Sequence, residues 1–418
     1  MKDKIKVVFV GHVDHGKSTL IGRLLYDTKS IPEDKFHEIR NNNGIQGDYD
    51  FAFLMDNFEE ERKQGVTIDT AQIFFKTTNK YYVIIDAPGH IEFIVNMITG
   101  AAQADVAVLI VDACEGVQEQ TKRHAVVLSL LGIKQVVLAI NKMDLVGFDK
   151  SAYEKTVLNI IPFLSNMGFD NIIAVPISAL NGDNVTLKSS NMSWYQGMTL
   201  CELFDSIEIN NSQISNDSLF TVQDVYNIFI RDKRRRIIVG KVESGVIEKD
   251  QSIMVLPSNE SAKIEAIEIY SQNRLMAHKG ESVGIVIDKP LFVERGNIIA
   301  SQENKLRIAS SFKATILWVG NSTGRIGDRL WLRCSTQEVY CYIDNVYEKI
   351  NSSTLEIIEG CKDNIKKLEL CEVSISTKQP LVINEICLND VLSRFILMDK
   401  NNIVAIGVIS YISEEENK

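Results

Sequence analysis

The chain has 418 residues and a formal net charge of −10 at pH 7, and 45% of its residues are hydrophobic. A chain of this length usually folds into two or three domains, and its composition is that of a globular protein, which excludes a largely disordered chain. The acidic total also argues against a nucleic-acid backbone as the main partner, because like charges repel each other.

The first half of the chain alternates short apolar runs with longer amphipathic segments. This pattern is typical of parallel strands that are connected by crossover helices. We expect strands at 5–10, 82–86, 106–112, 136–141 and 172–177, and helices at 17–27, 91–103, 117–131 and 152–167. Together these elements predict a doubly wound α/β domain with a mainly parallel sheet.

The second half is β-rich and is divided by polar segments. The stretch 209–218 has neither a helix nor a strand period and is typical of a linker, and a second polar break lies at 301–305. After each of them, short apolar runs alternate with turns, as in small antiparallel barrels. We therefore expect an α/β domain over residues 1–212 and β-barrel domains over 217–303 and 306–413.

A glycine-rich loop follows the first expected strand and leads into a helix. Its residues are Gly11, His12, Val13, Asp14, His15, Gly16, Lys17, Ser18 and Thr19. The loop matches the phosphate-loop pattern G-x-x-x-x-G-K-[ST], in which backbone N–H groups and the lysine surround the phosphates of a nucleotide. We expect the Ser18 hydroxyl to bind Mg²⁺. A glycine turn with a solvated lysine is the alternative, which the later motifs disfavour.

A second motif, Asp86-Ala87-Pro88-Gly89-His90, ends the strand expected at 82–86. A carboxylate at this place can hold a magnesium-bound water, and the Gly89 N–H can approach the γ-phosphate. We expect His90 to orient the attacking water, because no glutamine stands there to do so. His90 is therefore the predicted catalytic residue.

Two further motifs end the next two strands, where ligands bind in open α/β sheets. They are Asn141-Lys142-Met143-Asp144 and Ser178-Ala179-Leu180. The Asp144 carboxylate can accept hydrogen bonds from N1–H and N2–H₂ of guanine, which adenine does not offer. We expect Asn141 to brace the base and phosphate loops, Lys142 to lie over the base, and the Ala179 N–H to meet O6. The predicted cofactors are therefore GTP and Mg²⁺.

The segment Gly65-Val66-Thr67-Ile68-Asp69 lies between the first two motifs. Thr67 is a candidate for a second hydroxyl on Mg²⁺, which would leave its place when the γ-phosphate departs, whereas a plain strand threonine is the alternative. The predicted metal ligands are Ser18, Thr67 and Asp86. The expected fold class is α/β plus all-β, a P-loop GTPase domain followed by two β-barrel domains.

These motifs resemble those of the elongation factor Tu superfamily, and the resemblance covers essentially the whole chain. It rests on residues 11–18, 65–69, 86–90 and 141–144. It implies that the two β-rich units are similar to the second and third barrels of that superfamily. It also implies that His90 corresponds to the histidine that promotes hydrolysis.

Within the superfamily, stretches in several parts of the chain resemble the large GTPase subunit of sulfate adenylyltransferase. They are 20–28, 64–69, 130–134, 139–146 and 394–399. The resemblance implies a subunit that couples GTP hydrolysis to the formation of adenylyl sulfate from ATP and sulfate. The adenylyl transfer itself would take place in a small catalytic partner subunit of the ATP-pyrophosphatase type.

Two other functions stay open at this point. A translational GTPase that binds tRNA or the ribosome is favoured by the segment 222–226 and by the basic run 231–236, although a solvated hairpin also explains that run. A GTP-dependent scaffold without a coupled enzyme is the third alternative.

Cysteine usage and hydropathy indicate where the protein works. The seven cysteines are odd in number and contain no Cys-x-x-Cys pair, so neither a disulfide framework nor a thiolate zinc site is expected. The longest apolar runs, such as 106–111, are shorter than the roughly 18 to 20 residues of a membrane span, and the N-terminus has no signal-peptide core. We expect a cytoplasmic protein.

Overall fold

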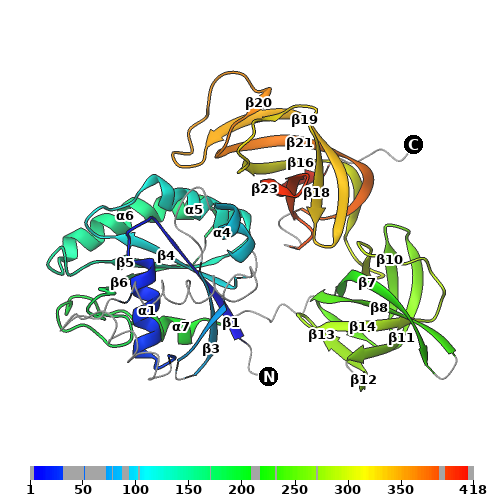
Figure 1. The fold of residues 1–418 in the computed structure, drawn as a ribbon, viewed down its shortest axis with the longest axis horizontal. Helices are drawn as coiled ribbons and strands as arrows, with labels where there is room; N and C mark the ends of the chain where they lie inside the picture. The colour runs from blue at the N-terminus through cyan, green and yellow to red at the C-terminus, as the bar shows by residue number, and fades with distance from the viewer. Residues whose placement is uncertain are drawn as a thin grey trace, which may run out of the picture. The chain divides into compact units, whose positions relative to one another are not determined.

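The structure is a computed structural model that describes residues 4–31, 51, 72–77, 79–86, 94–101, 104–169, 171–208, 217–230, 233–269, 272–385 and 391–412. It divides into two compact units, Met1–Ile209 with Ser352–Thr354, and Asn210–Asn351 with Leu355–Lys418. The first unit is an α/β domain and the second contains two antiparallel barrels (Figure 1). The predicted fold class is therefore confirmed.

The first unit contains a six-stranded sheet with the order β2-β3-β1-β4-β5-β6. Its strands are β1 (Lys4–Gly11), β2 (Gln72–Lys76), β3 (Tyr81–Asp86), β4 (Val106–Asp112), β5 (Gln135–Asn141) and β6 (Asn171–Pro176). All neighbouring pairs in this sheet are parallel except β2 with β3. The five expected strands are present, and the antiparallel edge strand β2 is an addition to them.

Helices cover both faces of this sheet. Those described are α1 (Lys17–Asp27), α4 (Ile94–Ala101), α5 (Glu119–Leu130), α6 (Lys150–Asn166) and α7 (Leu200–Ser206). Figure 1 shows α1 and α7 on one face and α4, α5 and α6 on the other. The apolar side chains of α1 and α7 form one buried cluster with those of the central strands, so the sheet holds α1, and the loop before it, in a fixed place.

The second unit begins with a seven-stranded antiparallel sheet that also contains a β10–β11 pairing and so closes on itself. Its elements are β7 (Leu219–Ile230), β8 (Lys233–Ser244), β10 (Ser252–Leu256), β11 (Glu260–Ile269), β12 (Gln272–Arg274), β14 (Ser282–Ile287) and β15 (Ile298–Ser301), with the separate pair β9 (Val246–Glu248) and β13 (Met276–His278). Residues that alternate along these strands form one buried apolar cluster. Closure of the sheet around that cluster protects its edges.

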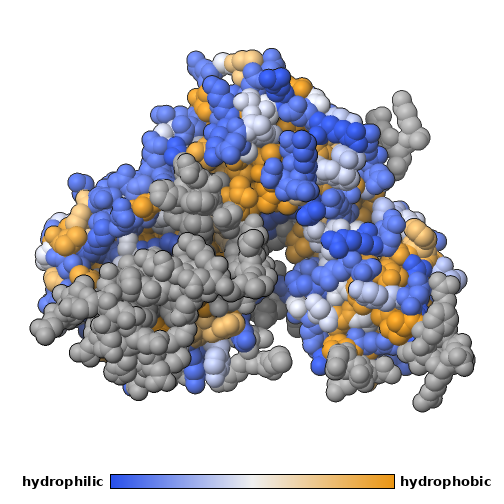
Figure 2. Space-filling view, in the orientation of Figure 1, coloured by the Kyte–Doolittle hydropathy of each residue, from blue (hydrophilic) through white to orange (hydrophobic). Residues whose placement is uncertain are grey.

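The remaining strands form a closed barrel with the order β16-β21-β19-β18-β22-β23. They are β16 (Arg307–Trp318), β18 (Arg329–Cys334), β19 (Gln337–Asn351), β21 (Glu369–Ile383), β22 (Arg394–Asp399) and β23 (Asn402–Ile412), and β17 (Gly324–Arg325) pairs separately with β20 (Asn364–Ile365). On the face shown in Figure 2 the described surface is mainly hydrophilic with scattered apolar patches, as is usual for a globular protein. Among the described helices, none is long and apolar enough to cross a membrane.

Candidate nucleotide-binding site

Four strands that precede predicted motifs, β1, β3, β5 and β6, end at the same edge of the sheet. Strand register pairs Phe9 of β1 with Asp86 of β3, and Asp112 of β4 with Asn141 of β5. The segments that follow these strands therefore start side by side at the carboxyl edge, where open α/β sheets bind ligands.

The phosphate loop has the turns that its sequence requires. Asp14 and Gly16 have left-handed φ values of 63° and 86°. A Cβ on Gly16 would lie 2.4 Å from Nδ2 of Asn141, so only glycine fits at this position. Gly16 is also the N-cap of α1 and supplies no side-chain cap, and the N-terminus of a helix favours an anion.

Asn141 joins the phosphate loop to the loop after β6. Its side chain is buried, its Nδ2 donates to the His15 carbonyl at 2.9 Å, and its Oδ1 accepts from the Ala179 N–H at 2.9 Å. One amide thus fixes the spacing between the segment that would hold the phosphates and the segment that would hold the base.

A second contact orients the carboxylate that would read the guanine edge. The Ser178 hydroxyl donates to Oδ1 of Asp144 at 2.6 Å, while the Asn181 N–H donates to the oxygen of that hydroxyl at 3.2 Å. The Ser178 proton is therefore directed toward Asp144, whose second oxygen does not take part in this contact.

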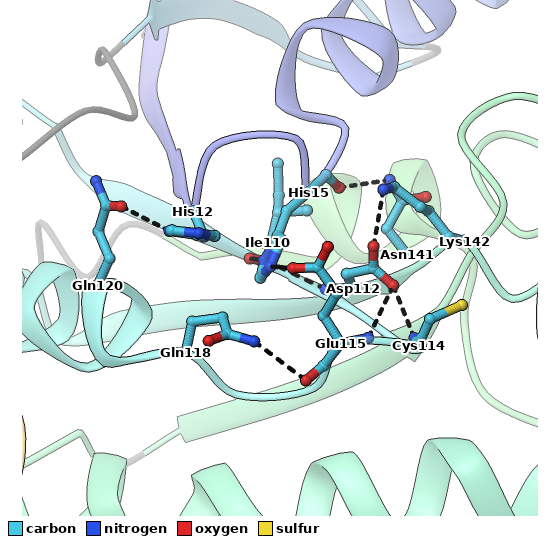
Figure 3. Close-up of polar contacts among 10 residues, drawn as sticks. All are labelled: His12, His15, Ile110, Asp112, Cys114, Glu115, Gln118, Gln120, Asn141 and Lys142. Atoms are coloured by element: carbon cyan, nitrogen blue, oxygen red, sulfur yellow. Dashed lines mark hydrogen bonds and ion pairs between the residues drawn. The ribbon is translucent and has the colours of Figure 1, made fainter.

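Lys142 directly follows β5 and contacts the end of β4. Its Nζ is 2.7 Å from Oδ2 of Asp112, a carboxylate that is almost completely buried (Figure 3). Burial raises the pKa of Asp112, but hydrogen bonds from Lys142 and from the Cys114 N–H outweigh it and hold the pKa below its ordinary value. Asp112 is therefore ionised at neutral pH.

Two histidines tie the phosphate loop to the segment between β4 and α5. Nδ1 of His12 lies 2.6 Å from Oε1 of Gln120, and Nε2 of His15 lies 3.3 Å from Oε2 of Glu115 (Figure 3). The His12 and His15 rings meet edge to face, with centroids 5.1 Å apart. The sequence assigned these two histidines only to the phosphate loop, and the structure adds that they anchor it.

His124 of α5 is a buried histidine behind the same loop. It is 2% exposed, and its Nδ1 has no hydrogen-bond partner among the described residues. Burial, together with nearby Lys17, His12 and His15, lowers the pKa of His124 to about 3. The imidazole is therefore neutral in the folded protein over the whole physiological range of pH.

Because His124 stays neutral in the folded state, we expect the protein to lose stability in mild acid. In the unfolded chain the ordinary pKa is near 6.5, so between that pH and about 3 the unfolded state binds the proton and the folded state does not. Lowering the pH from 6.5 to 5 should cost about 2 kcal/mol through this group. We expect His124→Gln to flatten the pH dependence of the urea midpoint between pH 7 and pH 5, whereas exposed His278→Gln should not. An unchanged slope in His124→Gln would contradict the prediction.

Several predicted site residues lie outside the described residues: Thr67, Ala87, Pro88, Gly89 and His90. Asp86 is the last residue of β3, and Ser18 stands in the first turn of α1, so both start from the edge that carries the phosphate loop. Hydroxyl and carboxylate oxygens are the hard ligands that Mg²⁺ prefers, and the residues present fit that ion.

Three polar residues of the site were missed by the sequence analysis: Asp112, Glu115 and Gln120. Asp112 could have been found, because it ends the strand Val106–Asp112 at the same edge as the recognised motifs. Glu115 and Gln120 lie in a loop and a helix with no such pattern, and only the fold brings them to the histidines.

Comparison with known proteins shows the family to which this chain belongs. The Elongation factor Tu GTP binding domain family matches residues 2–225, and the GTP-eEF1A C-terminal domain-like family matches residues 311–410. The chain belongs to the elongation factor Tu-like GTPases. This GTPase is 36% identical over 430 residues to elongation factor 1-alpha of Methanopyrus kandleri, with 99% of each chain covered.

Two other relatives of this GTPase have different names. Sulfate adenylyltransferase subunit 1 of Aliarcobacter butzleri is 34% identical over 424 residues, which cover 100% of this chain and 89% of the relative. The bifunctional enzyme NodQ of a Rhizobium species is 36% identical over 419 residues, 98% of this chain, and the chain spans 63% of NodQ. Similarity over nearly the whole of this chain thus extends to elongation factor 1-alpha, to sulfate adenylyltransferase subunit 1 and to NodQ at similar identity.

Proposed function

We propose that this protein binds and hydrolyses GTP with Mg²⁺ in the cytoplasm, as the regulatory subunit of a sulfate adenylyltransferase. In this function it couples GTP hydrolysis to the formation of adenylyl sulfate by a small catalytic subunit. The observation that carries the nucleotide part is the bridge made by Asn141 between the His15 carbonyl and the Ala179 N–H. This bridge supports the proposal, because one side chain joins the loop of residues 11–19 to the loop after β6.

The proposed ligands divide the nucleotide between these loops. The phosphates take the N–H groups of residues 11–19 and the Lys17 ammonium, and the base takes Asn141 to Asp144 and Ser178 to Leu180. Ser18, Thr67 and Asp86 would hold Mg²⁺, which supplies charge neutralisation at the phosphates when bound. His90 would orient the water, with Ala87, Pro88 and Gly89 beside the γ-phosphate.

The charges of the chain support a protein partner over tRNA. The net charge is −10, which repels a polyanion. Within the basic run, Arg235 pairs with Glu268 at 2.6 Å, and Arg236 donates to the carbonyls of Leu291 and Val293. These two arginines already have partners within the protein, so the run offers less charge to phosphates than its sequence indicates.

The full-length similarity to sulfate adenylyltransferase subunit 1 supports the specific activity. A translational function is the second candidate, because the similarity to elongation factor 1-alpha is as extensive. The two candidates differ in what GTP controls: the yield of adenylyl sulfate in one, and the binding of aminoacyl-tRNA in the other.

Reconstitution tests the proposal. Alone, the protein should hydrolyse GTP slowly and make no adenylyl sulfate; with a small catalytic subunit, ATP, sulfate and GTP, both activities should rise. Sulfate adenylation is strongly uphill, so a second hydrolysis can drive it only if each site responds to the state of the other. We expect Lys17→Met to abolish the GTP-dependent increase in adenylyl sulfate and Lys150→Met, an exposed lysine of α6, to leave it intact.

The same mixture separates the two candidates. Binding of aminoacyl-tRNA is measured in parallel, with GTP and with GDP. If adenylyl sulfate formation ignored this protein while aminoacyl-tRNA bound it only with GTP, the translational function would replace the proposed one.

A further inference from the structure

We propose that Asp112 is a positioning residue for guanine nucleotide recognition, which acts by holding the side chain of Lys142 in place at the base site. The inference rests on the proposed binding of guanine nucleotides and adds a residue outside the recognised motifs. It follows from how the carboxylate is held and from how Lys142 is fixed at both ends.

The two carboxylate oxygens of Asp112 have separate contacts. Oδ1 accepts the Cys114 N–H at 2.7 Å and the Glu115 N–H at 3.4 Å, while Oδ2 contacts Lys142 Nζ at 2.7 Å. The loop after β4 therefore sets the orientation of the carboxylate, and its second oxygen is aimed at the lysine. With the side chain about 2% exposed, this ion pair is largely shielded on the carboxylate side.

The backbone fixes the other end of Lys142. Its φ is 61°, a left-handed value that is unusual for lysine. The next residue, Met143, is fully buried and its N–H donates to the Ile177 carbonyl at 3.2 Å, while the Lys142 carbonyl accepts the Leu145 N–H at 3.1 Å. A lysine held at its Cα and at its ammonium has its methylene chain stretched between two fixed points.

This arrangement prepares the base site before a nucleotide arrives. A free lysine loses rotamer freedom when it packs on a ligand, and a lysine that is already ordered does not lose it again. The methylene chain would contact the face of the purine, not its edge. The contact should therefore strengthen the binding of all nucleotides with a purine ring of this shape equally. Discrimination among purines that differ at the ring edge would be left to Asp144.

Another path from Asp112 leads to the phosphates. Its backbone N–H lies 3.3 Å from Nδ1 of His15 in the phosphate loop. That contact belongs to the main chain and survives substitution of the side chain. The carboxylate also orders the Glu115 N–H, and Glu115 contacts His15 of the phosphate loop, so a double-mutant cycle decides whether the effect of removing the carboxylate passes through Lys142.

The experiment measures equilibrium binding of fluorescent GDP to the full chain and its displacement by unlabelled GDP and IDP. The variants are Asp112→Asn, Lys142→Met and the double variant, with exposed Glu119→Gln as the matched carboxylate control. We expect Asp112→Asn to weaken the binding of GDP and of IDP by the same factor, about tenfold to a hundredfold. The double variant should bind no more weakly than Lys142→Met, and Glu119→Gln should bind as the unaltered protein does.

Three outcomes would overturn the inference. Additive losses of GDP affinity in the double variant would show that Asp112 does not act through Lys142. A changed ratio of GDP affinity to IDP affinity in Asp112→Asn would show that Asp112 acts on Asp144. If Asp112→Asn fails to fold, Asp112→Ser, which retains an acceptor for the Cys114 N–H, replaces it; failure of both to fold would assign Asp112 to stability instead. Absence of GDP binding in the unaltered protein would refute the proposed function itself, which is a different result.

Discussion

Asp144→Asn should move the nucleotide preference of the protein from guanosine to xanthosine triphosphate. In the proposed complex the carboxylate would accept from guanine N1–H and N2–H₂, whereas an amide N–H₂ in its place would donate and meet those donors unfavourably. Xanthine carries an oxygen at position 2, which can accept from the amide. We expect GTP affinity to fall about a hundredfold or more and XTP affinity to rise by a similar factor.

The neighbouring hydroxyl decides which way the new amide points. Ser178 donates to Oδ1 of Asp144 at 2.6 Å, so the amide oxygen of the variant should keep that position and the N–H₂ should face the base. Competition binding with GTP, XTP and ATP measures the change, and Glu154→Gln, an exposed carboxylate on α6, is the control. A variant that still preferred GTP would contradict the assignment of Asp144, as would equal affinity of the unaltered protein for ATP and GTP.

His90→Ala should slow GTP hydrolysis by about a hundredfold or more and leave GTP affinity nearly intact. A residue that orients the attacking water acts in the transition state more than in the bound ground state. Single-turnover phosphate release and equilibrium GTP binding, both with the catalytic partner present, separate the two quantities.

An exposed histidine of the separate pair β9–β13 provides the control for this variant. His278→Ala in β13 should change neither quantity. Loss of GTP affinity in His90→Ala, with unchanged hydrolysis per bound nucleotide, would refute the catalytic role of His90.

Sequence reasoning located elements well where local signals were strong. Helix α1 occupies Lys17–Asp27 as expected, because a glycine-rich turn precedes it and apolar residues recur at the helix period. Strand β4 also coincides with its expected range, since a short run of apolar residues that ends in Asp112 is typical of a buried parallel strand. Both elements carry their own signal within a few residues.

Other elements depend on partners that are distant in the chain. Strand β2 has two adjacent aromatic residues, and only its pairing with β3 decides that Phe75 faces the core while Phe74 remains exposed. Helix α7 has only seven residues, too few to show a clear helical period. Its capping box between Thr199 and Glu202 is the one local sequence signal that marks its start. The contact of Asp112 with Lys142 joins the end of β4 to the loop after β5, and neither segment has a sequence signature for it.

The Asn141 amide has a consequence for the way in which a nucleotide leaves. Since its two hydrogen bonds connect the phosphate loop and the base loop, neither loop can open without breaking a contact that orders the other. The two loops should therefore open together as one cooperative unit, with a shared opening free energy. The base would then detach from its loop, and the phosphates from theirs, in a single kinetic step. Any partner that loosens one loop would accelerate the departure of the whole nucleotide.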